Sequence, residues 1–266
     1  MSKIRTTDLI RKKAAGEKIP VLTAYDATMA ALLERAGIDV LLVGDSLGMV
    51  VLGHETTVPV TMADMLHHTK AVSRGAHHAL IVSDMPFLSY EVSADETLRN
   101  AGQLLAEGGA AAVKLEGAHL ETVRRLVDAG IPVMGHLGLL PQHVNQLGGF
   151  RKQGQTESSA RQLIADALAL QESGAFSLVL ESIPDELAAE VTALLSIPTI
   201  GIGAGPHCDG QVLVSNDLLG LTTGSIPPFA KQYAHLGSQI VDAAQRYIGD
   251  VTAGEFPAHP VAHASR

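Results

Sequence analysis

Four acidic residues in this sequence stand at or near the ends of short apolar runs: Asp45, Asp84, Glu116 and Glu181. Such apolar runs are typical of strands buried on both faces of a parallel sheet. Carboxylates are otherwise avoided there, because removing a charge from water costs free energy. If these strand ends share one face, the four acids need a cation or shared protons, since close like charges raise one another's pKa.

Asp45 and Asp84 form the best pair for a metal. Mg²⁺ typically takes one or two protein carboxylates and leaves positions for water and substrate oxygens. Taken singly, each acid has an equally good structural explanation as a helix cap or strand end. Asp84, which precedes Met85 and Pro86, could end a strand without any chemical role.

Lys114 and Glu116 are two residues apart on one expected strand, so their side chains point the same way and Lys114 lies deeper. Lys114 could pair with an acidic substrate group, act as a Schiff-base nucleophile, or form a structural ion pair with Glu116. His136 ends the next apolar run and could bond a ligand oxygen or a loop carbonyl.

A repeated unit positions these side chains: a helix ends at Gly and an apolar strand follows at once. Strands are expected at residues 20–26, 38–45, 79–84, 111–116, 131–136, 176–181, 198–205 and 211–219. Eight such units predict an α/β fold, a (β/α)₈ TIM barrel, with a doubly wound open sheet as the alternative. Residues 1–253 are expected to form this single catalytic domain, and residues 254–266 a flexible C-terminal tail.

Smaller features complete the expected fold. Asp26, Thr61 and Ser93 are expected to cap the helices that follow them. Residues 137–158 are rich in Gly and Gln and lack a clean period, as in a lid, a binding loop or a dispensable surface excursion.

Composition excludes several classes of protein. The 266 residues carry a formal charge of −9 and no basic stripe, which argues against nucleic-acid binding. We find no apolar run long enough to span a membrane and no signal peptide. Cys208 is the single cysteine, which fits a reducing compartment, so we expect a cytoplasmic protein.

Blocks along nearly the whole chain resemble the ketopantoate hydroxymethyltransferase family, also called 3-methyl-2-oxobutanoate hydroxymethyltransferases. The blocks are residues 23–26, 42–48, 53–54, 80–86, 113–117, 135–139, 178–181, 201–205 and 209–211. Departures from the family pattern are confined to places such as residues 206–208 and the C-terminal tail.

The resemblance implies a Mg²⁺-dependent transfer of a hydroxymethyl group from 5,10-methylenetetrahydrofolate to 3-methyl-2-oxobutanoate. The product is 2-dehydropantoate, an intermediate in pantothenate and coenzyme A biosynthesis. In such a reaction a Mg²⁺-stabilised enolate attacks the folate methylene. The resemblance also implies a homo-oligomer, expected to be a decamer.

The same resemblance implies roles for individual residues. Asp45, Asp84 and Glu116 match the metal site, Asp45, Ser46, Asp84, Lys114 and His136 match substrate contacts, and Glu181 matches the catalytic base.

Three other functions remain open. A Mg²⁺-dependent oxoacid lyase or mutase of the phosphoenolpyruvate mutase type shares the architecture, but Cys208 is not placed for the catalytic Cys loop of those enzymes. An aldolase could form a Schiff base on Lys114. A barrel that only binds a ligand or acts as a scaffold is the non-catalytic alternative, against which the four acids argue.

Overall fold

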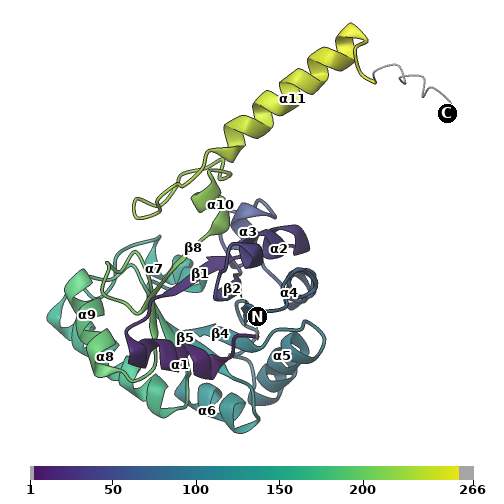
Figure 1. The fold of residues 1–266 in the computed structure, drawn as a ribbon. Helices are drawn as coiled ribbons and strands as arrows, with labels where there is room; N and C mark the ends of the chain where they lie inside the picture. Colours follow the sequence, from purple (N-terminus) through teal and green to yellow (C-terminus); the bar gives the residue numbers. More distant parts are fainter. Residues whose placement is uncertain (1–2, 258–266) are drawn as a thin grey trace. The chain divides into compact units, whose positions relative to one another are not determined.

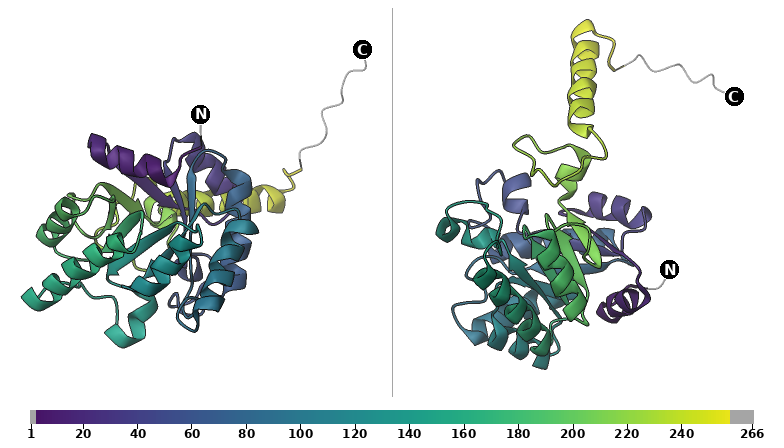
Figure 2. Two further views of the ribbon diagram at one scale, coloured as in Figure 1. Left: turned by 90° about the horizontal axis from the view of Figure 1, so that it is seen from below. Right: turned by 90° about the vertical axis from the view of Figure 1, so that its left-hand side faces the viewer.

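The computed structural model describes residues 3–257. Eight parallel strands follow one another in chain order, and β1 pairs with β8 to close a barrel. In the unit that contains the barrel, helices lie around the outside of the strands (Figures 1 and 2). The closed barrel confirms the (β/α)₈ prediction and excludes the doubly wound open sheet.

The strands are short and nearly equal in length. They are β1 (Ile19–Thr23), β2 (Val40–Val43), β3 (Leu80–Asp84), β4 (Ala112–Glu116), β5 (Val133–Gly138), β6 (Ser177–Glu181), β7 (Thr199–Ile202) and β8 (Gly210–Leu213). The helices are α1 (Thr6–Ala15), α2 (Ala27–Arg35), α3 (Leu47–Val50), α4 (Met62–Gly75), α5 (Ala94–Ala106), α6 (Leu120–Asp128), α7 (Val144–Leu147), α8 (Glu157–Glu172), α9 (Asp185–Leu194), α10 (Ser215–Leu219) and α11 (Leu236–Ala253), with a 3₁₀ turn η1 (Pro141–His143).

Alternate residues of several strands belong to two different cores. In β3, Leu80 and Val82 join the core inside the barrel, whereas Ile81 packs in the outer core with the helices. Asp84 and, in β4, Lys114 continue the inward series by the two-residue period of a strand. The alternation that fills the barrel therefore also carries the polar residues to its mouth.

Side-chain caps fix where three of the helices begin. Asp26 accepts a hydrogen bond from Met29 N at 2.8 Å, and Ser93 accepts one from Glu96 N at 3.2 Å. Thr61 caps α4 through a reciprocal capping box. All three predicted caps are confirmed.

The prediction of one strand over residues 211–219 is wrong in its second half. The strand β8 ends at Leu213, and α10 begins at Ser215. Ser215 N donates to Thr23 Oγ1 at 2.9 Å, which ends the strand pairing at this point. Ser and Asp are common at the starts of helices, and here Ser215 and Asp217 favour a helix although the residues around them are apolar.

Helix α1 lies at the amino-terminal ends of the strands. Its Leu9 is fully buried and belongs to the core inside the barrel. Lys12 pairs with Asp39, just before β2, at 2.8 Å, and Lys13 pairs with Asp209, just before β8, at 2.7 Å. Leu9 and the two ion pairs hold α1 across this end of the barrel.

Residue contacts divide the chain into two compact units between Ser215 and Asn216. In the second unit, α11 buries none of its residues. The predicted division into residues 1–253 and a flexible tail stays a prediction, and residues 258–266 of that tail lie outside the described residues. Among residues 3–257, no helix combines the length and apolar character needed to cross a membrane.

Candidate active site

The carboxyl ends of five neighbouring strands and the segments after them carry the polar residues predicted from the sequence. Asp84, Glu116 and Glu181 are the last residues of β3, β4 and β6. Lys114 lies within β4 and His136 within β5, and Asp45 follows β2 after Gly44. The structure brings these six side chains into one connected cluster, which we call the acid cluster.

Asp45 and Asp84 are joined directly. Asp45 N donates to Asp84 Oδ2 at 3.0 Å, and both residues are buried. Burial and the nearby charges of Asp84 and Glu116 raise the pKa of Asp45 well above its usual range. Burial also raises the pKa of Asp84, against the opposing effect of Lys114. Two adjacent carboxyls that resist ionisation indicate a place where a cation would be stabilised.

Lys114 supplies positive charge inside the barrel. Its Nζ lies 3.2 Å from Asp84 Oδ1 and 3.2 Å from His136 Nδ1. Burial would lower the pKa of Lys114, but Asp84, Glu116 and Asp45 together outweigh it and raise that pKa. Lys114 is therefore held in the ammonium form.

His136 connects Lys114 with two of the acids. An ammonium has only donors, so His136 Nδ1 accepts from Lys114 and the ring proton of the neutral form stands on Nε2, 3.2 Å from Glu181 Oε2. Glu116 Oε1 lies 3.6 Å from Nδ1. Burial and Lys114 lower the pKa of His136, but contacts with Glu116 and Glu181 outweigh them and raise it. His136 thus lies between Lys114 and Glu181, and its Nε2 is close to Glu181 without a hydrogen bond of good geometry.

Ser46 lies next to Asp45, but its hydroxyl is 2.9 Å from that of Tyr25. A Cβ at position 44 would stand only 2.7 Å from Ser46 Oγ, so a side chain there would displace the Ser46 hydroxyl. Ser46 is half-buried and remains accessible beside the acid cluster.

The donor set fits Mg²⁺. Within residues 3–257, no three His, Cys, Asp or Glu side chains form a ready-made metal site. Mg²⁺ requires only one or two protein carboxylates because it keeps several waters. Asp84 Oδ1 is a buried oxygen without a hydrogen bond, and Asp45 stands beside it. Both carboxylate oxygens of Glu116 already face a partner, since Oε2 accepts from Gln142 N and Oε1 lies 3.6 Å from His136 Nδ1. These contacts fit a supporting position better than direct coordination of the metal.

Sequence reasoning did not identify two residues at this site, Gln142 and Tyr90. Gln142 belongs to η1 in the long connection after β5, and Nε2 donates to Asp45 Oδ2 at 2.8 Å. Tyr90 donates to Gln142 Oε1 at 2.7 Å. The connection lacks periodicity, so no sequence signal distinguished Gln142 from its neighbours.

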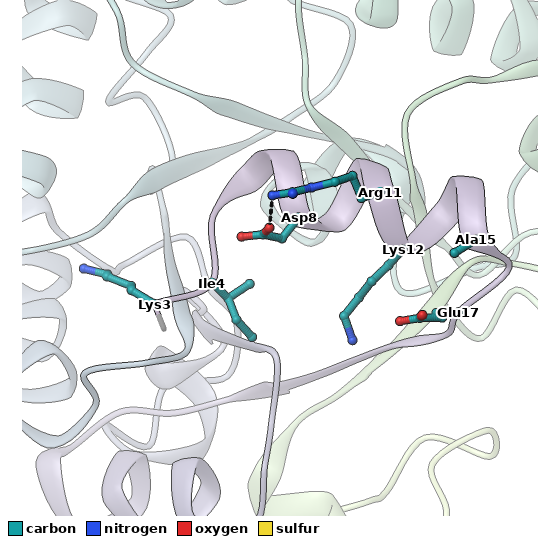
Figure 3. A pocket seen from close by; sticks show the side chains of 7 residues that line it. All are labelled: Lys3, Ile4, Asp8, Arg11, Lys12, Ala15 and Glu17. Carbon is teal, nitrogen blue, oxygen red and sulfur yellow. Dashed lines mark hydrogen bonds and ion pairs between the residues drawn. The ribbon is translucent and has the colours of Figure 1, made fainter. Parts of the chain in front are cut away.

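A surface pocket lies beside α1, at the other end of the strands from the acid cluster (Figure 3). Its lining residues are Lys3, Ile4, Asp8, Arg11, Lys12, Ala15 and Glu17. Arg11 pairs with Asp8, and Lys12 pairs with Asp39, so charges at this pocket are already balanced. The chemistry expected from the sequence lies at the strand ends instead.

Solved structures share this architecture. A phosphonopyruvate hydrolase in complex with oxalate and Mg²⁺ superposes with a TM-score of 0.62 at 12% identity, covering 94% of this chain and 88% of that chain. A 2,3-dimethylmalate lyase of the PEP mutase/isocitrate lyase superfamily gives a TM-score of 0.59 at 17% identity, covering 97% and 91%. These similarities support the fold.

Sequence relatives are much closer. A 3-methyl-2-oxobutanoate hydroxymethyltransferase of Chlorobium phaeobacteroides is 56% identical, over 96% of this chain and 94% of the relative. One of Desulfotalea psychrophila is 58% identical, over 94% and 90%. The family profile described as ketopantoate hydroxymethyltransferase matches residues 3–259. The chain therefore belongs to the ketopantoate hydroxymethyltransferase family.

Proposed function

We propose that this protein transfers a hydroxymethyl group from 5,10-methylenetetrahydrofolate to 3-methyl-2-oxobutanoate, with one water consumed, to give 2-dehydropantoate for pantothenate biosynthesis. The observation that carries the proposal is the buried pair of Asp45 and Asp84 beside the Lys114 ammonium. An α-oxoacid offers a carboxylate and a keto oxygen, and both need positive charge in a dry site. The names of the relatives support the same substrate.

The chain's own groups would bind and orient the oxoacid. Lys114 would attract its negative oxygens, and the Ser46 hydroxyl would donate to its carboxylate. Asp45 and Asp84 would hold Mg²⁺, with Glu116 as the third acid, and the bound cation would supply Lewis-acid stabilisation of charge on the keto oxygen. A structure of the same fold described with oxalate and Mg²⁺ supports this use of the architecture.

Glu181 would remove the proton from C3 of the oxoacid. Its Oε2 lies 3.2 Å from His136 Nε2, and Glu181 keeps more exposure to the mouth of the barrel than the other acids. His136 would fix the carboxylate and stabilise it between proton transfers. The carbon nucleophile formed at C3 would then attack the methylene carbon of the folate.

Turnover of 3-methyl-2-oxobutanoate with methylenetetrahydrofolate, with and without Mg²⁺, tests the proposal. We expect formation of 2-dehydropantoate that stops when EDTA is added. Glu181→Gln should keep oxoacid binding yet lose exchange of the C3 proton with deuterated water. Exchange at the native rate in Glu181→Gln would show that another group is the base.

Two competing mechanisms find less support. Enzymes of the lyase and mutase type usually carry a catalytic loop that contains a cysteine, whereas Cys208 is buried just before β8, near the amino-terminal ends of the strands. A Schiff-base aldolase requires a neutral amine, but the neighbouring acids raise the pKa of Lys114. Borohydride trapping of the oxoacid on Lys114, with activity surviving EDTA, would favour the aldolase.

We also propose a homo-oligomer, with a decamer as the expected assembly, located in the cytoplasm. Exposed apolar side chains on α11 support association: Ile240, Val241, Tyr247, Ile248 and Val251 are all exposed. Light scattering of the purified protein would measure the assembly, and a monomer at micromolar concentration would contradict it.

A further inference from the structure

We propose that Gln142 is a positioning residue that couples the connection after β5 to the carboxylates of the acid cluster. The inference rests on the proposed function only in taking Asp45 as a metal ligand. It concerns the segment from Gly138 to Gln153, which we call the mouth loop.

The backbone N–H and both ends of the side-chain amide of Gln142 have hydrogen-bond partners. Its backbone N donates to Glu116 Oε2 at 3.0 Å. Its Nε2 donates to Asp45 Oδ2 at 2.8 Å and to Met85 O at 3.0 Å, and its Oε1 accepts from Tyr90. Gln142 thereby joins segments that follow β2, β3 and β5 to the end of β4.

These partners fix the orientation of the amide. A carbonyl such as Met85 O only accepts, so the NH₂ group must face it, whereas the Tyr90 hydroxyl can donate to Oε1. The amide then donates to Oδ2 of Asp45. In Asp84, Oδ2 accepts from Asp45 N, and Oδ1 lies 3.2 Å from the Lys114 ammonium. One oxygen of each carboxylate is thus fixed by an N–H donor, which sets the direction of the second oxygen.

The mouth loop is anchored on the strand that carries the proposed base. At its start Leu139 N donates to Glu181 O at 2.8 Å, and at its end Gln153 N donates to Ser182 O at 2.8 Å. Ser182 has a positive φ of 49°, an uncommon conformation for a residue with a side chain. Both ends of the loop are held by backbone contacts, and Gln142 holds its interior.

The acid cluster is nearly closed to water in this arrangement. Asp45, Asp84 and Glu116 are 4%, 2% and 1% exposed, and Gln142 itself is 3% exposed. Gln142 of the mouth loop contacts Asp45 and Glu116 directly, so we infer that the loop moves when an oxoacid binds at these oxygens. Because Gln142 bonds both the loop and Asp45, opening the loop releases a bond that orients the carboxylate, and binding at the carboxylates favours closure.

Gln142→Met is the sharpest test, because it keeps the approximate volume and the backbone N–H but removes all three side-chain hydrogen bonds. Binding of Mn²⁺, as a probe for the divalent site, would be followed by electron paramagnetic resonance of the free ion. We expect the Mn²⁺ dissociation constant to rise about 10- to 100-fold, the range typical for loss of a group that supports a metal ligand. Gln155→Met is the matched control, since Gln155 is exposed in the same connection and bonds only Lys152 O.

Trypsin cleavage after the exposed residues Arg151 and Lys152 reports on the loop. In the native protein, Mn²⁺ with 3-methyl-2-oxobutanoate should slow this cleavage. In Gln142→Met, Mn²⁺ with 3-methyl-2-oxobutanoate should leave the rate of cleavage unchanged, even when Mn²⁺ is saturating. If Gln142→Met fails to fold, Tyr90→Phe carries the test, because it leaves Gln142 in place but frees its Oε1, with an expected loss of several-fold in affinity.

A dissociation constant within twofold of native, or loop protection at saturating Mn²⁺ equal to native, would overturn the role of Gln142. The proposed function fails independently. If the native protein shows no turnover but Gln142→Met binds Mn²⁺ more weakly, the proposed reaction is wrong and the positioning role of Gln142 stands. If the native protein turns over its substrates but Gln142→Met binds Mn²⁺ as tightly as native, the proposed reaction stands and the positioning role is wrong.

Discussion

Lys114→Met would leave the buried carboxylates of the acid cluster without their internal cation. The methionine side chain has similar length and volume, so packing inside the barrel changes little. The lost interaction is mainly that between Lys114 Nζ and Asp84 Oδ1, which are 3.2 Å apart. With an effective dielectric constant of about 20, charges at this distance attract by roughly 5 kcal/mol. Breaking a buried ion pair costs about 3–5 kcal/mol, so we expect the free energy of unfolding of Lys114→Met to be lower by this amount at pH 8.

The loss of stability in Lys114→Met should depend on pH, because Asp45 and Asp84 titrate differently without the ammonium. Without the ammonium, the pKa values of Asp45 and Asp84, already raised by burial, rise further. The folded variant then holds protons that the unfolded chain releases, so its stability increases as pH falls toward about 4, the ordinary carboxyl pKa. The deficit relative to the native protein should therefore shrink between pH 8 and pH 5.

Urea unfolding followed by circular dichroism would measure these differences. Lys70→Met is the matched control, because Lys70 pairs with Glu107 on the surface and should lose less than about 1 kcal/mol. The double variant Lys114→Met with Asp84→Asn should recover part of the loss. A deficit below about 1 kcal/mol at pH 8, or one that is constant down to pH 5, would refute the reasoning.

Three further outcomes are expected. Asp84→Ala should abolish Mg²⁺-dependent binding of 3-methyl-2-oxobutanoate in calorimetry, and unaltered binding would contradict the metal site. Gly138→Ala should lower the melting temperature and the turnover number, because φ is +96° and a Cβ would stand 2.2 Å from Glu181 O; strain of this kind costs about 1–3 kcal/mol. Glu34→Gln should cost about 1 kcal/mol at pH 7. Glu34 accepts from the backbone N–H groups of residues 77–79, which outweigh burial and lower its pKa, so the difference should disappear as pH falls through that lowered pKa.

Most of the acid cluster could be predicted because strand geometry leaves little freedom. In a closed parallel barrel all carboxyl ends lie at one rim, and side chains two apart share a face. The end of an apolar run was enough to place Asp84, Glu116 and Glu181 at this rim. Lys114 followed from its spacing to Glu116, and its contacts with Asp84 and His136 agree with that placement.

Gln142 and Tyr90 could not be predicted for the opposite reason. Both lie in connections whose path depends on tertiary contacts, and neither amide nor phenol has a periodic signal. The error over residues 211–219 has a related cause: a short helix start inside an apolar run differs from a strand only through its partner, Thr23, which is distant in sequence. Local pattern determines strands well and loops poorly.

Helix α1 covers the end of the barrel opposite the acid cluster. Leu9 lies in the inner core, and the ion pairs of Lys12 and Lys13 hold the helix at the starts of the strands. Lys114 lies two residues deeper than Glu116, about 7 Å along the strand. A molecule bound at that depth is covered by whatever binds nearer the mouth. If the proposed reaction takes place there, we expect the oxoacid to bind before the folate and the product that contains it to leave last.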